Sequence, residues 1–297
     1  MKEIFKRHPR YKVAPEDFSS MPDNLWVRCP RCRELLYSRE HEQAMWVCSK
    51  CKYHFQITSR QRIDITLDSG TFHECDAEMQ STDPLDFHSM GDSYSDKLGQ
   101  YSEKSGTREA FIYGTGTIDA QDVVLGVTEF NFGGGSMGAV FGEKVARALD
   151  LAAQRHVPLI VFSSGGGARM QEGAISLMQM AKTVAALDRF KGEGLPFFSV
   201  MTDPCLGGMT ASYAMLGDVN LAEPGAYIGF AGRRVIEQTM RQKLPPNAAT
   251  AEFLLEHGMI DMVVPRADLP GVLGRLIRLY VTANQAQVGR ELVAQRA

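Results

Sequence analysis

The chain has 297 residues, of which 44% are hydrophobic and 23% are charged, and its formal net charge is −3. These values are ordinary for a globular protein and exclude disordered, collagen-like and coiled-coil classes. No run approaches the roughly 18 apolar residues that a membrane-spanning helix needs.

The N-terminal stretch MKEIFKRHPRYK is basic and is followed by no apolar segment. We therefore expect no secretory signal and take the cytoplasm as the default location. Residues 1–62 are net basic, whereas the rest of the chain is net acidic. This asymmetry indicates a small basic module, able to attract phosphates, on an acidic body.

Four cysteines form the pattern C-x2-C-x15-C-x2-C, namely Cys29, Cys32, Cys48 and Cys51. Each C-x2-C turn can aim two thiolates at one tetrahedral metal, so the two turns predict a closed, structural zinc site. Zinc would also supply folding energy that so small a module lacks. Disulfides or redox pairs are the alternative, which a cytosolic location disfavours. We predict a zinc ribbon over residues 25–55, with short strands at MWVC and YHFQI.

After the ribbon, the sequence predicts a connecting segment, a loop, a hairpin and a helix. Residues 56–75 predict a connecting helix and turn, and the polar residues 80–108 predict a loop. Two β-rich runs, AFIYGTGTID and DVVLGVTEFNF, predict a hairpin that turns at Ala120-Gln121. The run FGEKVARALDLAAQRH follows with helical periodicity, since Val145, Leu149 and Ala152 share one face.

Strand, glycine loop and helix then alternate. The expected strands are VPLIVFS, PFFSVMTD and MIDMVV, and the expected helices are ISLMQMAKTVAALDRF, TASYAMLGD, RRVIEQTMRQ, AEFLLEHG and DLPGVLGRLIRLYVTAN. This alternation predicts an α/β body with helices packed on a sheet.

The motif GGGSMG, residues 133–138, fits both a dinucleotide-binding loop and a hydrolase nucleophile elbow at Ser136. The next expected strand ends in Ser163-Ser164 rather than in an acidic residue, which argues against a dinucleotide site. After Ser136 the only histidines are His156 and His257, and both fall at expected helix ends. A plain strand-to-helix turn therefore remains the alternative to either site.

Two further glycine loops, SSGGGARMQEG and CLGGM, each follow an apolar strand directly and precede an expected helix. Backbone N–H groups at such places are unpaired. Two loops from neighbouring strands could converge on one carbonyl oxygen and form an oxyanion hole. Tight packing alone is the alternative. Cys205 adjoins one loop, but the role of a small buried residue is favoured for it over that of a catalytic thiol. Cys75 has no evident partner.

The zinc pattern and the glycine loops together resemble the β-subunit family of bacterial acetyl-CoA carboxylase carboxyltransferases. The similar segments are WVRCPRC…VCSKC, SSGGGARMQEG, LGGMTASYAMLGDVNLAEPGAYIGFAGRRVIEQT and LPPNAATAEFLLEHGMIDMVV. The resemblance implies a crotonase-like (ClpP/crotonase) spiral body, residues 61–297, behind a four-cysteine zinc ribbon module, residues 1–60, with the zinc finger at 29–51. It implies carboxyl transfer from carboxybiotin to acetyl-CoA, giving malonyl-CoA for fatty acid biosynthesis.

The resemblance also implies site residues and partners. Oxyanion donors would come from Gly166, Gly167 and Ala168 in one loop and from Gly207 and Gly208 in the other. One structural Zn²⁺ would be bound, and acetyl-CoA and carboxybiotin would be substrates. The implied partners are a carboxyltransferase α subunit, in an α2β2 assembly, a biotin carboxyl carrier protein and a biotin carboxylase.

Two alternatives stay open. Another crotonase-type enzyme, a hydratase or an isomerase, would use a carboxylate near the loops, and Glu172 is the nearest candidate. A zinc-dependent nucleic-acid-binding protein would use the basic ribbon, although a stronger charge excess would be expected for that role. The ribbon could instead help to hold the CoA phosphates.

Overall fold

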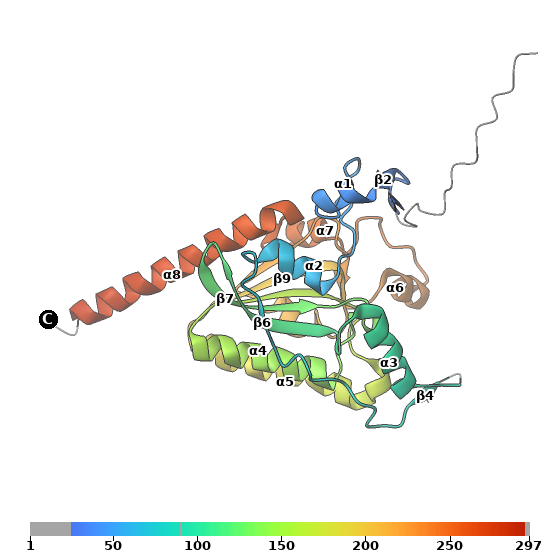
Figure 1. Cartoon of the computed structure of the whole chain (residues 1–297), viewed down its shortest axis with the longest axis horizontal. Coiled ribbons are helices and arrows are strands. Elements are labelled where there is room, and N and C mark those ends of the chain that lie inside the picture. Colours follow the sequence, from blue (N-terminus) through green and yellow to red (C-terminus); the bar gives the residue numbers. More distant parts are fainter. Residues whose placement is uncertain (1–24, 90, 295–297) are drawn as a thin grey trace, which may run out of the picture.

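A mixed sheet forms the centre of the molecule, with helices on both of its faces (Figure 1). The computed structural model describes residues 25–294 except Met90, so the basic stretch MKEIFKRHPRYK lies outside the described residues. Within the described chain, the sheet order is β12-β10-β9-β8-β7-β6-β3, and β11 pairs with β9. These strands are β3 His73–Cys75, β6 Phe111–Ile118, β7 Gln121–Thr128, β8 Leu159–Gly165, β9 Phe197–Leu206, β10 Val219–Ala222, β11 Ile228–Gly229 and β12 Met262–Val263.

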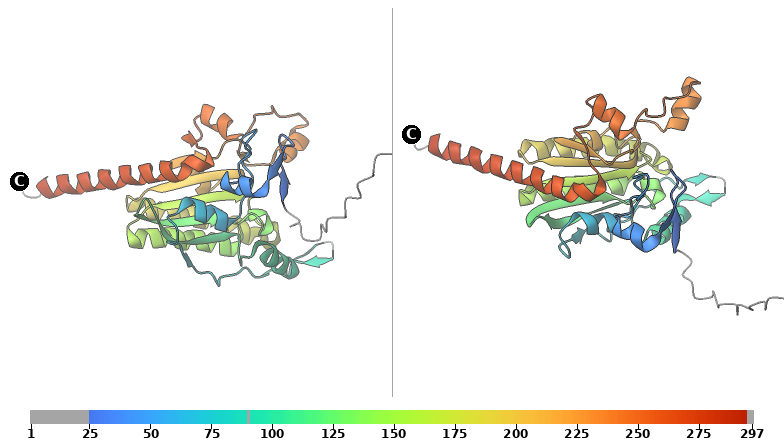
Figure 2. Two further views of the ribbon diagram at one scale, coloured as in Figure 1. Left: turned by 45° about the horizontal axis from the view of Figure 1, so that its top comes forward. Right: turned by 90° about the horizontal axis from the view of Figure 1, so that it is seen from above.

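Strands β7 to β12 pair in parallel, whereas β3, β6 and β7 pair antiparallel. Helices α4 (Ala139–Arg155) and α5 (Gly173–Gly192) cover one face, and α2 (Ser59–Thr66) and α8 (Leu269–Ala294) cover the other (Figure 1). Helix α8 continues well past the edge of the sheet (Figure 2). The predicted α/β architecture is confirmed.

Each face of the sheet has its own apolar core, because successive side chains of a strand point to opposite faces. Val124 belongs to the core under α4 and α5, and its neighbour Leu125 belongs to the core under α2 and α8. The predicted inner face of α4 is confirmed, since Val145, Leu149 and Ala152 are all buried.

The predicted hairpin is formed by β6 and β7, but its turn is Asp119-Ala120 rather than Ala120-Gln121. Both turn residues have positive φ, 48° and 59°, which suits the type of turn that matches the strand twist. The Asp68 carboxylate accepts the amides of Asp119 and Ala120 at 3.2 and 2.9 Å and so holds a conformation that non-glycine residues disfavour.

The loop predicted for residues 80–108 is wrong, because this segment contains a short hairpin and a helix. The elements are β4 His88–Ser89, β5 Asp92–Ser93 and α3 Tyr94–Ser105. The Ser93 side chain caps the helix by accepting the amide of Asp96. The inner face of this helix is short: Tyr94 is fully buried, and Leu98 and Tyr101 pack partly against the core.

The helix predicted at TASYAMLGD is also wrong. Only a 3₁₀ turn, Tyr213–Met215, forms there. The carbonyl of Ala214 accepts the Ser199 hydroxyl at 2.6 Å instead of a helical amide, and Ser212 has non-helical backbone angles. The other predicted helices of this region are α6 Arg233–Met240 and α7 Ala251–Glu256.

The cysteine-rich ribbon lies above the sheet (Figure 1). It consists of β1 Trp26–Arg28, β2 Leu35–Tyr37 and α1 Ser38–Gln43. The strands expected at MWVC and YHFQI are reduced to one isolated bridge between Val47 and His54. The pairing of β1 with β2, on either side of the first cysteine turn, was not predicted.

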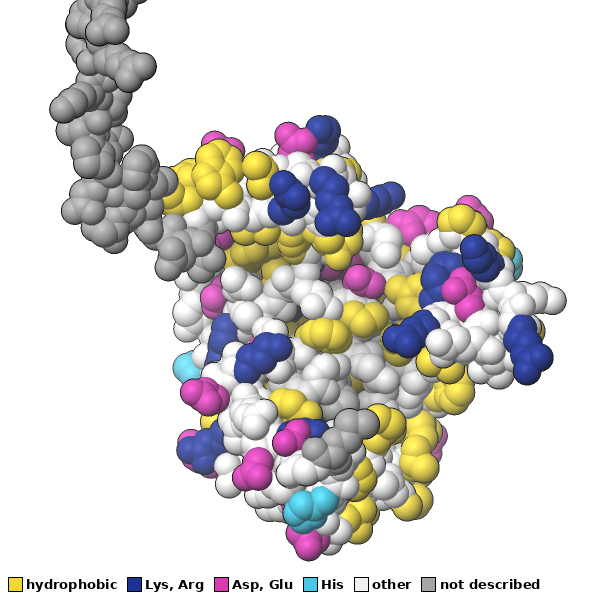
Figure 3. Space-filling view, turned by 90° about the vertical axis from the view of Figure 1, so that its right-hand side faces the viewer, with side chains coloured by type: hydrophobic (Ala, Val, Ile, Leu, Met, Phe, Trp, Pro, Cys, Tyr) yellow, Lys and Arg dark blue, Asp and Glu magenta, His cyan; other side chains and the backbone are white. Residues whose placement is uncertain are grey.

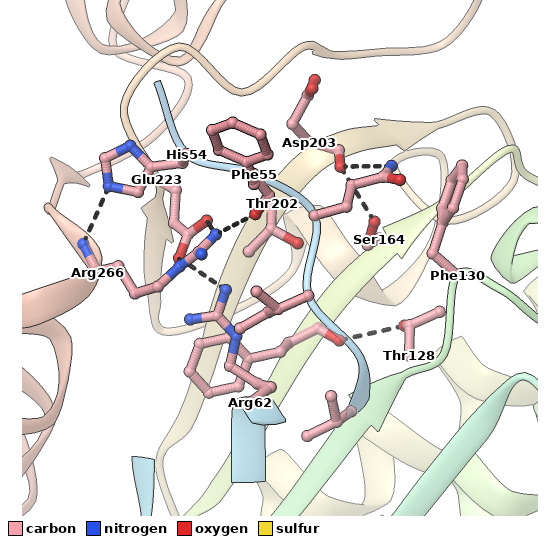
Figure 4. Close-up of a pocket in the computed structure, with 14 residues that line it drawn as sticks. His54, Phe55, Arg62, Thr128, Phe130, Ser164, Thr202, Asp203, Glu223 and Arg266 are labelled. Carbon is pink, nitrogen blue, oxygen red and sulfur yellow. Dashed lines mark hydrogen bonds and ion pairs between the residues drawn. The ribbon is translucent and has the colours of Figure 1, made fainter. Parts of the chain in front are cut away.

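Buried charges attach the ribbon to the body (Figure 4). Arg266 donates to the ribbon carbonyls of Met45 and Phe55 at 2.9 and 2.8 Å. It also forms an ion pair with Glu223 at 2.8 Å, and Arg62 pairs with the same carboxylate at 2.7 Å. All three charged side chains are at most 5% exposed. Glu223 therefore neutralises part of the charge of two buried arginines beneath the ribbon.

This arrangement predicts a specific acid sensitivity. Burial would raise the pKa of Glu223, but Arg62 and Arg266 outweigh it and lower that pKa from 4.5 to about 2. The ionised Glu223 carboxylate then contributes its full stabilisation of the folded state above pH 4.5, and this contribution is lost as the pH falls toward 2. We expect the wild type to lose about 2 kcal/mol more unfolding free energy than Glu223→Gln between about pH 6 and pH 3.

Urea unfolding followed by circular dichroism at both pH values measures this difference. If the unfolding free energies of the two proteins depended equally on pH, the lowered pKa assigned to Glu223 would be contradicted.

Candidate functional site

The two glycine loops leave the same edge of the sheet, side by side. Strand β8 ends at Gly165 and pairs in parallel with β9, where Gly165 lies opposite Cys205. The loops are in close contact, since a Cβ placed on Gly167 would lie 3.1 Å from both the Cα of Gly207 and the nitrogen of Gly208. Gly167 also has φ +100°, which residues with a side chain rarely adopt. The contact therefore requires glycine for two reasons, the close approach of the backbones and the positive φ.

The backbone amides of the loops are not equally available. The N–H of Gly166 donates to the carbonyl of Gly134 at 3.0 Å, and that of Gly207 donates to Gly229 at 3.1 Å. These two predicted donors are therefore already used within the protein. In the described part of the chain, the amides of Gly167, Ala168 and Gly208 have no hydrogen-bond acceptor. Three of the five predicted residues thus keep a free donor.

Apolar side chains border these free amides. A Cβ on Gly208 would lie 3.2 Å from the sulfur of Met180, 3.4 Å from Cε of Met137 and 3.5 Å from the nitrogen of Ala168. Gly167 and Gly208 are buried, and Ala168 is partly exposed. Amides from two strand ends therefore share a confined, weakly polar environment, in which hydrogen bonds to an oxyanion are strongest.

A hollow lies at this edge of the molecule, between the ribbon and the segment of α6 (Figure 3). Lys and Arg side chains gather on both sides of it. The exposed basic residues of these two parts include Arg28, Arg31 and Arg33 on the ribbon and Arg234, Arg241 and Lys243 on and after α6. Phe230, 75% exposed, precedes α6. A phosphate-bearing ligand would meet positive charge at both walls.

Glu172 does not face this hollow. Its side chain is 1% exposed, and Oε1 accepts the Tyr94 hydroxyl at 2.7 Å. Oε2 accepts the amide of Ala139, at the start of α4, at 2.6 Å. A carboxylate held by these donors and by Arg169 is a structural group, which weakens the hydratase or isomerase alternative.

The motif GGGSMG forms a 3₁₀ turn, Gly133–Gly135, that packs against the first glycine loop. The hydroxyl of Ser136 accepts the Nε–H of Arg169 at 3.1 Å, and no described contact joins it to a histidine. His257 bonds the carbonyl of Phe253 and stacks on its ring, and His156 ends α4. The arrangement supports the interpretation as a close-packed turn and not a nucleophile elbow.

The two remaining cysteines are poor nucleophiles. Cys205 is fully buried, and this burial raises the pKa of its thiol to about 12. Burial also raises the pKa of Cys75. Neither thiol would be ionised near neutral pH, and the thiolate is the reactive form.

The four predicted zinc ligands lie together. Their sulfur atoms are all within 4.8 Å of one another, with Cys29 and Cys51 at 3.6 Å and Cys32 and Cys48 at 3.7 Å. Ligands at about 2.3 Å from a tetrahedral Zn²⁺ are about 3.8 Å apart, so the cluster has the size of a metal site. The cysteines also make up much of the ribbon's small core, together with Leu36, Tyr53 and Phe55.

Arg169 was missed in the sequence, although it directly follows Ala168. It is 1% exposed and contacts several polar residues that are buried or half-buried, which are Ser81, Tyr94, Glu109, Ser136 and Glu172. An arginine beside a glycine loop was the available signal, but its partners lie up to 88 positions away.

Comparison with known proteins gives consistent matches. The Carboxyl transferase domain family matches residues 56–264. The acetyl-coenzyme A carboxylase carboxyl transferase subunit β of Herpetosiphon aurantiacus is 49% identical over 293 residues, covering 99% of this chain and 98% of that protein. The subunit of the same name from Chloroflexus aurantiacus is 46% identical over 299 residues, covering 100% and 98%.

Solved structures share the fold. A Pseudomonas malonate decarboxylase hetero-tetramer in complex with malonate superposes with a TM-score of 0.60 at 25% identity, covering 76% of this chain and 82% of that one. Transcarboxylase 12S superposes with a TM-score of 0.61 at 23% identity, covering 79% of this chain and 42% of that longer one. The predicted carboxyltransferase-type, crotonase-like α/β fold is confirmed. In the described residues no helix is long and apolar enough to span a bilayer.

Proposed function

Because the chain belongs to the family of acetyl-CoA carboxylase carboxyl transferase β subunits, which form malonyl-CoA, we propose that its two glycine loops bind the thioester oxygen of acetyl-CoA. The donors in this proposal are the amides of Gly167 or Ala168 in one loop and of Gly208 in the other. The observation that supports it is the adjacency of these unpaired amides at neighbouring strand ends.

The chemistry needs such donors. Carboxyl transfer breaks the N–CO₂⁻ bond of carboxybiotin and a C–H bond of the acetyl group, and it forms the new C–C bond of malonyl-CoA. The departing ureido nitrogen takes the proton. As the C–H bond breaks, the thioester oxygen gains negative charge, and donors already aimed at it lower the barrier by about 3 kcal/mol each. No carboxylate or histidine base is required of this chain.

The substrates and partners follow from the same family. We propose that the basic residues on both sides of the hollow contact the phosphates of CoA, and that carboxybiotin arrives on a biotin carrier protein. A carboxyltransferase α subunit would supply the biotin side of the site, in an α2β2 assembly. Nucleic-acid binding by the ribbon, and the division into modules 1–60 and 61–297, stay predictions.

We further propose that Cys29, Cys32, Cys48 and Cys51 hold one structural Zn²⁺. Four thiolates fill a tetrahedral site and leave no open position for catalysis. The metal would therefore hold the ribbon together, and the ribbon's own residues would cover one side of the hollow.

A single methyl group tests the proposed oxyanion hole. In Gly208→Ala the added Cβ would stand about 3.5 Å from the amide of Ala168, in space that the oxygen would need. Gly208 is a better choice than Gly207, whose φ of +62° would add backbone strain. We expect turnover of acetyl-CoA by the complex with its α subunit to fall about 10²-fold, with an unchanged circular dichroism spectrum.

The matched control is Gly192→Ala at the end of α5, where an added Cβ meets nothing within 4 Å. Turnover there should equal that of the wild type. Wild-type turnover in Gly208→Ala as well would remove the oxyanion assignment.

Tryptophan fluorescence tests the zinc proposal, because the only two tryptophans of the chain, Trp26 and Trp46, both lie in the ribbon. We expect one zinc per chain, and a red-shifted emission when a chelator removes it or when Cys48 is replaced by Ser. The reason is that the ribbon's core consists largely of the ligands themselves. Circular dichroism should show that the body stays folded. Unchanged emission from fully metal-free protein would show that zinc does not support the ribbon.

A further inference from the structure

We propose that Arg169 is a positioning residue for carboxyl transfer, because its buried guanidinium fixes the backbone that presents the amides of Gly167 and Ala168. This inference rests on the proposed function. It concerns a side chain that touches neither the hollow nor the reacting atoms, and so acts only through the glycine loop.

The main chain on either side of Ala168 is hydrogen-bonded to Met137 in the manner of two paired strands. The N–H of Arg169 donates to the carbonyl of Met137 at 2.9 Å, and the N–H of Met137 donates to the carbonyl of Gly167 at 2.8 Å. Ala168 lies between these two bonds, paired with Met137 in an isolated parallel bridge. Its own amide is left free by this geometry, so the position of residue 137 sets the position of the donor.

The guanidinium fixes that same neighbour segment from the other side. Nε donates to the hydroxyl of Ser136 at 3.1 Å, and Nη2 donates to the Ser136 carbonyl at 2.7 Å. Ser136 directly precedes Met137. The backbone of Arg169 thus bonds to Met137 and its side chain bonds to Ser136. The planar guanidinium fixes the direction of its hydrogen bonds to Ser136.

The far end of the guanidinium is anchored in a different part of the chain. Nη2 pairs with Glu109, and Nη1 donates to Ser81 at 2.9 Å, to Tyr94 at 3.2 Å and to Glu172 at 3.2 Å. Glu172 belongs to the glycine loop itself, whereas Ser81 lies between β3 and β4, Tyr94 begins α3 and Glu109 lies in the segment before β6. One side chain therefore joins the glycine loop to three other segments.

Electrostatic stabilisation by Arg169 itself does not explain this arrangement. Two carboxylates, Glu109 and Glu172, surround one guanidinium, and all three side chains are at most 1% exposed. The local charge is therefore not positive, and each nitrogen already donates within the protein. A buried ion cluster of this kind gives little net stability, but it does specify one geometry.

A lysine in place of Arg169 tests whether the shape of the guanidinium or only its positive charge is needed. Arg169→Lys keeps the positive charge near Glu109 and Glu172, but a single ammonium cannot also hold Ser136 on the other side. We expect the loop amides to shift. Because they act mainly in the transition state, kcat should fall about 10- to 100-fold, while KM for acetyl-CoA stays within about twofold.

The matched control is Arg62→Lys. Arg62 is also a buried arginine, 4% exposed, that pairs with the buried carboxylate of Glu223. Its guanidinium lies over the ring of Phe162 in β8, but in the described chain none of its hydrogen bonds goes to the glycine loop. We expect both variants of the complex to lose a similar amount of thermal stability, with kcat of Arg62→Lys within about twofold of the wild type. Wild-type kcat in Arg169→Lys, or an equal loss of kcat in both variants, would overturn the proposal.

Tyr94→Phe provides a second, milder test should Arg169→Lys not fold. It keeps Arg169 but removes the hydroxyl that lies between Nη1 and Glu172. We expect kcat to fall several-fold at constant KM, and an unchanged kcat would contradict the proposal. Gly208→Ala separates this inference from the function beneath it. Lost turnover in Gly208→Ala with full turnover in Arg169→Lys and Tyr94→Phe would refute only the role of Arg169.

Discussion

The parallel pairing of β8 with β9 is the constraint on which the candidate site depends. It sets Leu159 opposite Phe197, and an irregularity between Ser163 and Gly165 then shifts the register by two residues of β9, so that Gly165 lies opposite Cys205 and both strands release their glycine loops at the same level. A slip of two residues along one strand would move its loop by about 6.6 Å, more than twice the length of a hydrogen bond. The site is thus a consequence of strand register before any individual side chain contributes.

Two clusters of buried charged residues also hold segments of the chain in place, and each cluster holds a different segment. The cluster around Arg169 holds the first glycine loop against the turn at Ser136. The cluster of Arg62, Glu223 and Arg266 holds the ribbon above the sheet. Burying ions is costly, and in our proposal the cluster around Arg169 has the role of selecting a single backbone geometry. Both clusters join segments that are distant in the sequence, which local propensity could not bring together.

Much of the function could be predicted from local patterns. The cysteine spacing indicated the four-cysteine cluster, and two glycine runs after apolar strands indicated the loops, because both signals are contained in short stretches of sequence. The choice among five amides could not be predicted, since Gly166 and Gly207 are occupied by carbonyls of Gly134 and Gly229. The helix α3 was missed because its apolar stripe consists of only three residues, Tyr94, Leu98 and Tyr101, in an otherwise polar segment that a serine cap helps to start.

The most direct test of the central claim is a structure of this chain, with its α subunit, bound to acetyl-CoA. The thioester oxygen should lie about 2.7–3.1 Å from the nitrogen of Gly208 and from that of Gly167 or Ala168. An oxygen more than about 4 Å from all three nitrogens, with the acyl group ordered elsewhere, would contradict the account.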